Sequence, residues 1–129
     1  MTGYAPTRLE LQLLPTSHTP GIARRRLVER FAPELDTDRL QDAMLLTSEL
    51  VTNALIHGRG RIEVSALLDE SRLTVDVTDQ GDGFERVPRE RGLDTVGGHG
   101  LYIVDALASR WGIHRGSSHV WFELERRAV

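Results

Sequence analysis

Apolar and polar residues alternate with a period of two in several short segments of the chain. This period is typical of a half-buried β-strand, because successive side chains of a strand point to opposite faces of the sheet. Short turns at Asp69–Ser71 and Arg115–Ser118 join two pairs of these segments, and each turn predicts a hairpin. The predicted strands are Leu9–Leu14, Arg61–Leu68, Arg72–Asp79, Trp111–His114 and Val120–Leu124.

Three other segments carry apolar residues at the spacing of an amphipathic helix. Pro20 favours a helix start in the first of them, and Gly58 is expected to end the second. The predicted ranges are about Gly21–Phe31 after a start at Ser17 or Thr19, Asp36 or Thr37 to His57, and His99–Arg110.

The long second helix is predicted to carry its polar residues on one flank. Glu49 and Asn53 lie one turn apart, nearly opposite the apolar positions, and His57 follows round the same flank. This trio is therefore predicted to lie outside the core and to face either solvent or a ligand. The apolar side is predicted to consist of Leu40, Met44, Thr47, Val51, Ala54 and Leu55.

These elements together predict an α+β two-layer sandwich. Its sheet is expected to be single, mixed and mostly antiparallel, with the helices packed on one face. A length of 129 residues suits one domain with a sizeable core. We therefore expect one domain over residues 1–129, with its core at about 9–127.

Composition and charge narrow the class of protein. The net charge of −3 gives no electrostatic case for binding nucleic acid or an anionic membrane. The absence of cysteine excludes disulfides and thiolate metal sites. The N-terminus lacks the regions of a signal peptide, and no apolar run approaches the roughly 20 residues of a membrane helix. These features predict a cytoplasmic protein.

Three motifs carry candidate chemistry. The first is Asp79, followed by Gly81 and Gly83, at the end of a predicted strand; these glycines let the backbone approach a flat ligand. The second is the pair Glu49 and Asn53. Alternatively, Asp79 starts an ordinary turn, and Glu49 is a solvated helix carboxylate.

The third motif is a glycine cluster that opens directly into an apolar helix. Backbone N–H groups in such a turn, together with the positive end of the helix dipole, suit a phosphate. All 16 basic residues are arginines, so no lysine can bind the phosphates, and either backbone N–H groups or arginine must supply the donors. A tight turn into the helix is the alternative. The cluster consists of Gly97, Gly98, His99, Gly100 and Leu101.

The order of the three motifs resembles the nucleotide-binding boxes of the GHKL ATPases. Within that superfamily the chain is similar to the bacterial anti-sigma-factor serine kinases, the RsbW-like branch. The resemblance runs from about Leu9 to Leu124 and implies the GHKL (Bergerat) ATP-binding fold, with ATP and Mg²⁺ as cofactors. It also implies that the charged segment Glu85–Val96 forms a lid over the nucleotide.

The resemblance assigns roles to individual residues. Asp79 would accept a hydrogen bond from the adenine amino group, with Gly81 and Gly83 against the ring. Ser118 would stand near the adenine in place of a more usual threonine. The phosphates would be bound by the cluster Gly97, Gly98, His99, Gly100 and Leu101. His57 is a further candidate for phosphate contact, but its position at the C-terminus of the helix, where a cation is favoured, explains it better.

Two side chains of the long helix complete the implied site. Asn53 would bind the metal through its amide oxygen, which adds no negative charge beside the phosphates. Glu49 would act as the general base toward an attacking hydroxyl. The sequence Gly81-Asp-Gly83, in place of the more usual Gly-Pro-Gly, adds a negative charge and could weaken nucleotide binding.

The resulting prediction is an ATP-dependent serine/threonine kinase that is also an anti-sigma factor. It would phosphorylate a small antagonist protein and, when free of it, hold a sigma factor inactive. The alternative is an ATP-binding switch that sequesters partners without phosphate transfer, and Glu49 distinguishes the two because a switch has no need of it. A detached histidine-kinase domain is a third interpretation, disfavoured by the lack of a phospho-acceptor helix. A homodimer is neither predicted nor excluded.

Overall fold

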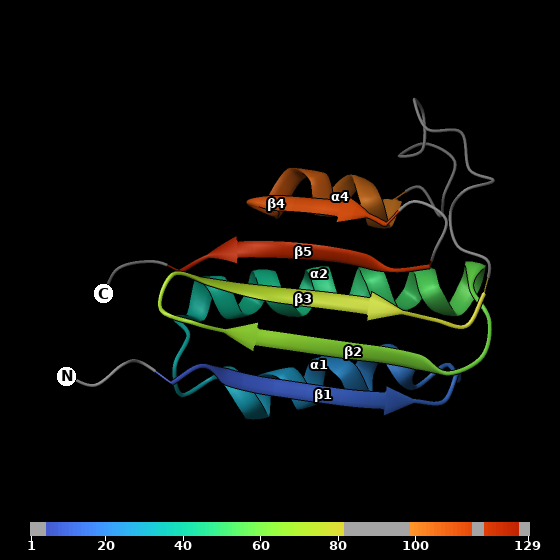
Figure 1. The fold of residues 1–129 in the computed structure, drawn as a ribbon, viewed down its shortest axis with the longest axis horizontal. Coiled ribbons are helices and arrows are strands. Elements are labelled where there is room, and N and C mark those ends of the chain that lie inside the picture. Colours follow the sequence, from blue (N-terminus) through green and yellow to red (C-terminus); the bar gives the residue numbers. More distant parts are fainter. Residues whose placement is uncertain (1–4, 82–98, 115–117, 127–129) are drawn as a thin grey trace.

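The structure is a computed structural model that describes residues 5–81, 99–114 and 118–126. The described elements follow the predicted order along the chain (Figure 1). They are β1 (Thr7–Leu13), α1 (Thr19–Phe31), α2 (Thr37–His57), β2 (Ile62–Leu68), β3 (Arg72–Thr78), α4 (His99–Leu107), β4 (Arg110–Ile113) and β5 (Val120–Glu125).

The strands form one sheet in the order β1-β2-β3-β5-β4. Each pairing among the described strands is antiparallel, so this part of the sheet is not mixed as predicted. The turn Asp69–Ser71 joins β2 to β3 as the hairpin that the sequence predicts. β3 lies at the centre, where Val75 is paired with Ala66 of β2 and Phe122 of β5.

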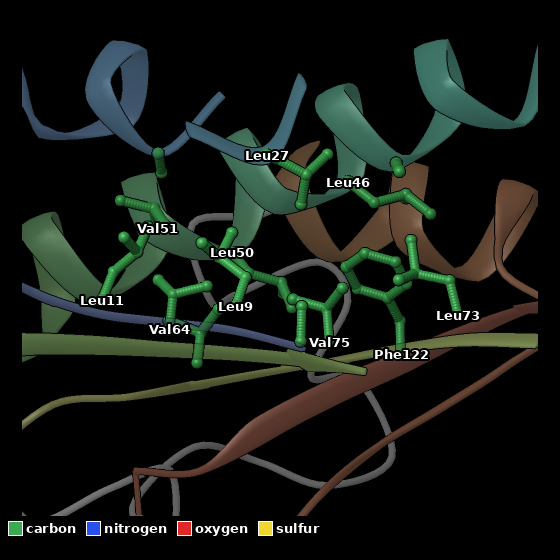
Figure 2. Packing of buried hydrophobic residues seen from close by; sticks show 14 of the residues in the cluster. Leu9, Leu11, Leu27, Leu46, Leu50, Val51, Val64, Leu73, Val75 and Phe122 are labelled. Atoms are coloured by element: carbon green, nitrogen blue, oxygen red, sulfur yellow. The ribbon is translucent and has the colours of Figure 1, made fainter. Parts of the chain in front are cut away.

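The core lies between one face of the sheet and the helices. Strand residues alternate between buried and partly exposed positions, so one face of each central strand is apolar. Figure 2 shows Leu27 of α1 and Leu46 and Leu50 of α2 above Val64 and Val75 of the sheet. The predicted two-layer sandwich with helices on one face is therefore confirmed.

α2 is the central helix of this layer. Asp36 caps it as predicted, because its carboxylate accepts a hydrogen bond from the Arg39 N–H at 2.8 Å. The helix contacts α1, α4 and strands β2, β3 and β5, so more than one of its sides is covered. Among the described helices none is long and apolar enough to cross a membrane.

The structure excludes one of the two predicted surroundings of Asn53, which is exposure to solvent. Its side chain is buried, with 4% exposed. The predicted apolar side omitted Ala43, Leu46 and Leu50, which are fully buried or nearly so. With these residues included, the buried side of α2 is centred closer to Asn53 than the predicted stripe, because neighbouring elements cover the helix on several sides.

The start of α1 agrees with one of the two predicted positions, whereas the end of α4 differs from the prediction. α1 begins at Thr19 with His18 at the cap position, where no side-chain hydrogen bond is made. α4 ends at Leu107, three residues before the predicted Arg110. The Ser109 N–H donates instead to the Glu123 carbonyl oxygen at 2.8 Å, so the chain has already joined the sheet at that point.

Candidate functional site

The candidate site lies where α2 and β3 both end. These two C-terminal ends are on the same side of the molecule (Figure 1). Asp79 directly follows β3, and Gly58 directly follows α2. The fold therefore brings together the helix that carries Glu49 and Asn53 and the strand that ends in Asp79.

The Asp79 carboxylate is buried, with 8% of the residue exposed. Its Oδ1 accepts hydrogen bonds from the Gly81 N–H at 2.6 Å and from the Arg59 N–H at 3.3 Å. No described residue donates a hydrogen bond to Oδ2. The bond to Gly81 is the one expected of an ordinary turn, but a turn alone explains neither the burial nor the second oxygen.

Gly58 determines how close the carboxylate can come to α2. A Cβ at this position would lie 2.2 Å from Asp79 Oδ2 and 2.6 Å from the Ala54 carbonyl oxygen. No side chain fits there, so the carboxylate rests directly on the backbone at the end of the helix. The sequence indicated Gly58 only as a helix end, and its contact with Asp79 is non-local.

Ser118 supports Asp79 from the other side. Its buried hydroxyl accepts a hydrogen bond from the Asp79 N–H at 3.2 Å and donates one to the Asp79 carbonyl oxygen at 2.7 Å. One hydroxyl thus satisfies both backbone groups of Asp79. The structure thus brings together Asp79 and Ser118, which were both predicted to lie near the adenine.

The candidate residues of α2 differ in their surroundings. Asn53 is buried, and its Nδ2 has no hydrogen-bond partner. Glu49 is half-buried and has no hydrogen bond or ion pair with the described residues. His57 is exposed in the last turn of the helix. A buried amide with an unused donor is costly, and such groups are frequent at sites completed by a ligand.

Some predicted site residues lie outside the part of the chain that the structure describes. Gly83, Gly97, Gly98 and the predicted lid Glu85–Val96 lie outside the described residues. His99 and Gly100 begin α4, and Leu101 follows them in its first turn. Among the described residues, no group of three or more His, Cys, Asp or Glu side chains is arranged to hold a metal ion.

The chain is similar to known proteins in sequence and in fold. A family model described as histidine kinase-like ATPase domain matches residues 16–123. An anti-sigma F factor of Clostridium acetobutylicum is 35% identical over 88 residues, which are 64% of this chain and 61% of that protein. A serine-protein kinase RsbW of Bacillus licheniformis is 31% identical over 86 residues, 54% of each chain. The match thus spans less than two thirds of the length of these relatives.

One solved structure is similar over nearly the whole chain. It is a crystal structure of the RsbU and RsbW domains of a Mycobacterium tuberculosis protein. The TM-score is 0.69 at 25% sequence identity, and the match covers 93% of this chain and 32% of the other.

Proposed function

The chain belongs to the histidine kinase-like ATPase domain family, as its motifs predicted, and on this basis we propose that it is an ATP-dependent anti-sigma kinase. It binds ATP with Mg²⁺ and transfers the γ-phosphoryl group to a serine or threonine of a small antagonist protein. When the antagonist is absent or phosphorylated, it holds a sigma factor inactive. The names of the relatives support this proposal, because they include anti-sigma F factors and a serine-protein kinase.

The observation that carries the proposal is that the two oxygens of the Asp79 carboxylate differ in their hydrogen bonds. Backbone N–H groups occupy Oδ1, whereas Oδ2 has no donor among the described residues. A carboxylate oxygen in this state, in a residue that is only 8% exposed, favours a ligand that brings its own N–H group. The exocyclic amino group of adenine is such a donor, and the oxygen at the same position of guanine is not.

Asn53 fits the metal that accompanies ATP. An amide oxygen is a ligand that Mg²⁺ accepts, and the ion usually takes only one or two groups from a protein. The lack of a metal cluster among the described residues is compatible with this mode, since the phosphates and water supply the other ligands. When bound, the ion would neutralise charge on the phosphates.

Glu49 is proposed as the general base. It lies one helical turn before Asn53, is half-buried, and has no ion pair with the described residues that would hold it elsewhere. Its carboxylate takes the proton of the attacking hydroxyl. The hydroxyl oxygen forms a bond to the γ-phosphorus, the bond to the bridging oxygen of ADP breaks, and ADP leaves with that electron pair.

Labelled ATP tests the proposal directly. The chain is incubated with labelled ATP and with small antagonist-like proteins of the same genome, and transfer is followed beside ATP affinity. We expect Glu49→Gln to bind ATP as the parent does and to transfer phosphate roughly 10²-fold more slowly, the usual scale for a positioned base. Glu29→Gln, at an exposed position of α1, is the matched control and should change neither.

The possible outcomes separate the two interpretations of the chain. Wild-type transfer by Glu49→Gln would contradict the role of Glu49. ATP binding without transfer to any antagonist would favour the switch that only sequesters its partners. A chain that binds no ATP would contradict the proposal as a whole.

A further inference from the structure

Gln80 joins the end of β3 to the turn that follows α2. Its backbone N–H donates to the Arg59 carbonyl oxygen at 2.8 Å. Its side-chain Oε1 accepts from the Arg61 N–H at 2.7 Å. One residue therefore binds both ends of a three-residue segment that lies about twenty positions earlier in the chain. An exposed glutamine with its oxygen used in this way is not merely a solvated side chain.

The turn is shaped around this glutamine. Gly60, between the two bonded residues, has a φ of 70°, which favours glycine. A Cβ at Gly60 would lie 2.0 Å from Gln80 Oε1. The backbone thus takes a left-handed conformation and leaves free the space that the amide fills. Gln80 and Gly60 fit together, because any side chain at Gly60 would collide with the Gln80 amide.

The same turn contacts the Asp79 carboxylate on one side. The Arg59 N–H donates to Asp79 Oδ1 at 3.3 Å, and the Gly58 backbone lies against Oδ2. The position of these two groups depends on the turn, which Gln80 holds at Arg59 and at Arg61. The Gly81 N–H is the other donor to Oδ1, at 2.6 Å, and its bond is local in the sequence, whereas the bond from Arg59 ties the carboxylate to the turn.

We propose that Gln80 is a positioning residue for recognition of the nucleotide base. It locks the turn over residues 58–61, the turn holds Oδ1 of Asp79, and Oδ2 is thereby kept as the acceptor for the base. Gln80 acts through the turn, because its side-chain oxygen is used by the Arg61 N–H and its backbone N–H by the Arg59 carbonyl oxygen. This inference rests on the proposed ATP binding and adds the element that sets base selectivity.

The test measures affinity for ATP and for GTP in the full chain by calorimetry, beside thermal unfolding. Gln80→Met keeps the length of the side chain but removes the acceptor, and we expect the ratio of ATP to GTP affinity to fall about tenfold, the scale of one hydrogen bond. Gln80→Glu keeps an acceptor oxygen and should keep the ratio. Gln41→Met, at an exposed position of α2, is the control for the substitution itself.

A second variant removes the same bond from its donor side. Arg61→Pro lacks the N–H group and should lower the ratio as Gln80→Met does; it carries the test if Gln80→Met does not fold. An unchanged ratio in a folded Gln80→Met chain, with only the unfolding temperature lowered, would overturn the inference and leave ATP binding intact. Failure of the parent chain to bind ATP would overturn the proposed function instead, and the inference with it.

Discussion

The two ends of β3 each carry an aspartate, and they use it differently. At the hairpin end, Asp69 Oδ1 accepts from the N–H groups of Ser71 and Arg72 at 2.8 and 2.9 Å. At the other end, Asp79 Oδ1 also accepts from two backbone N–H groups. The hydrogen-bond patterns are alike. The difference is burial: Asp69 is partly exposed, whereas Asp79 is buried between the ends of α2 and β3.

Burial is what distinguishes an aspartate that only forms a turn from one that can bind a ligand. The second oxygen of a partly exposed aspartate is accessible to water, so the turn needs no ligand. The second oxygen of a buried aspartate needs a donor, and its environment selects the donor that comes. The hydrogen bonds of the turn do not distinguish Asp69 from Asp79. Only the packing around the two residues does.

Replacing each aspartate by alanine tests this difference most strongly. Asp79→Ala should lower ATP affinity at least about thirtyfold, which corresponds to about 2 kcal/mol, because the base then loses its buried partner. Asp69→Ala should leave ATP affinity unchanged and lower only the free energy of unfolding. Calorimetry of both variants gives the answer. Equal ATP affinity in folded Asp79→Ala and parent chains would contradict the base-binding role of Asp79.

Two glycines give the next largest contrast. Gly58→Ala places a methyl group 2.2 Å from Asp79 Oδ2, so the carboxylate must move. We expect it to cost about 1–3 kcal/mol of unfolding free energy and to weaken ATP binding as well. Gly21→Ala is the matched control, since the nearest atom to its Cβ is the end of the Arg24 side chain at 3.5 Å.

The control should be neutral or stabilising by up to about 1 kcal/mol, because alanine is the better helix former. Denaturant unfolding and ATP titration of the two variants decide the matter. Parent-like ATP affinity in Gly58→Ala would show that the carboxylate does not need its place against α2.

The smallest effect concerns acid stability at the hairpin end. The backbone N–H groups of Ser71 and then Arg72 lower the pKa of Asp69 below its ordinary value. A lowered pKa stabilises the fold above the unfolded value of about 3.9, and this contribution is lost as the pH falls through the folded pKa. The unfolding free energy of Asp69→Asn should therefore fall less steeply below about pH 4 than that of the parent. Parallel curves would show that the two bonds contribute nothing.

Much of the fold could be predicted because its signals are local. Periods of two and 3.6 marked the elements, and Asp36 and Gly58 marked the ends of α2 by their capping chemistry. The burial of Asn53 could not be predicted in the same way. A helical period identifies one apolar side, whereas α2 is covered by two helices and three strands, and the order in which these pack is a property of the whole fold.

The residues of the candidate site also differ in whether local sequence signals could identify them. Asp79, Glu49 and Asn53 could be chosen from their motifs and Ser118 from the family resemblance, and the structure places Asp79 and Ser118 in direct contact. Gly58 and Gln80 could not, because each acts on a partner about twenty residues away. No local pattern distinguishes a glycine that only ends a helix from one on which a carboxylate rests.

The order of strands in the sheet also has a consequence for folding. β2 and β3 pair across a short turn, whereas β3 pairs with β5 over a long stretch of chain, as in Arg72 with Glu125. Closing long loops before their contacts form slows folding. Asp79 and Ser118 meet through this distant pairing. A chain that has formed its helices and the β2–β3 hairpin, but has not yet added β5, therefore lacks the hydrogen bonds between Ser118 and Asp79.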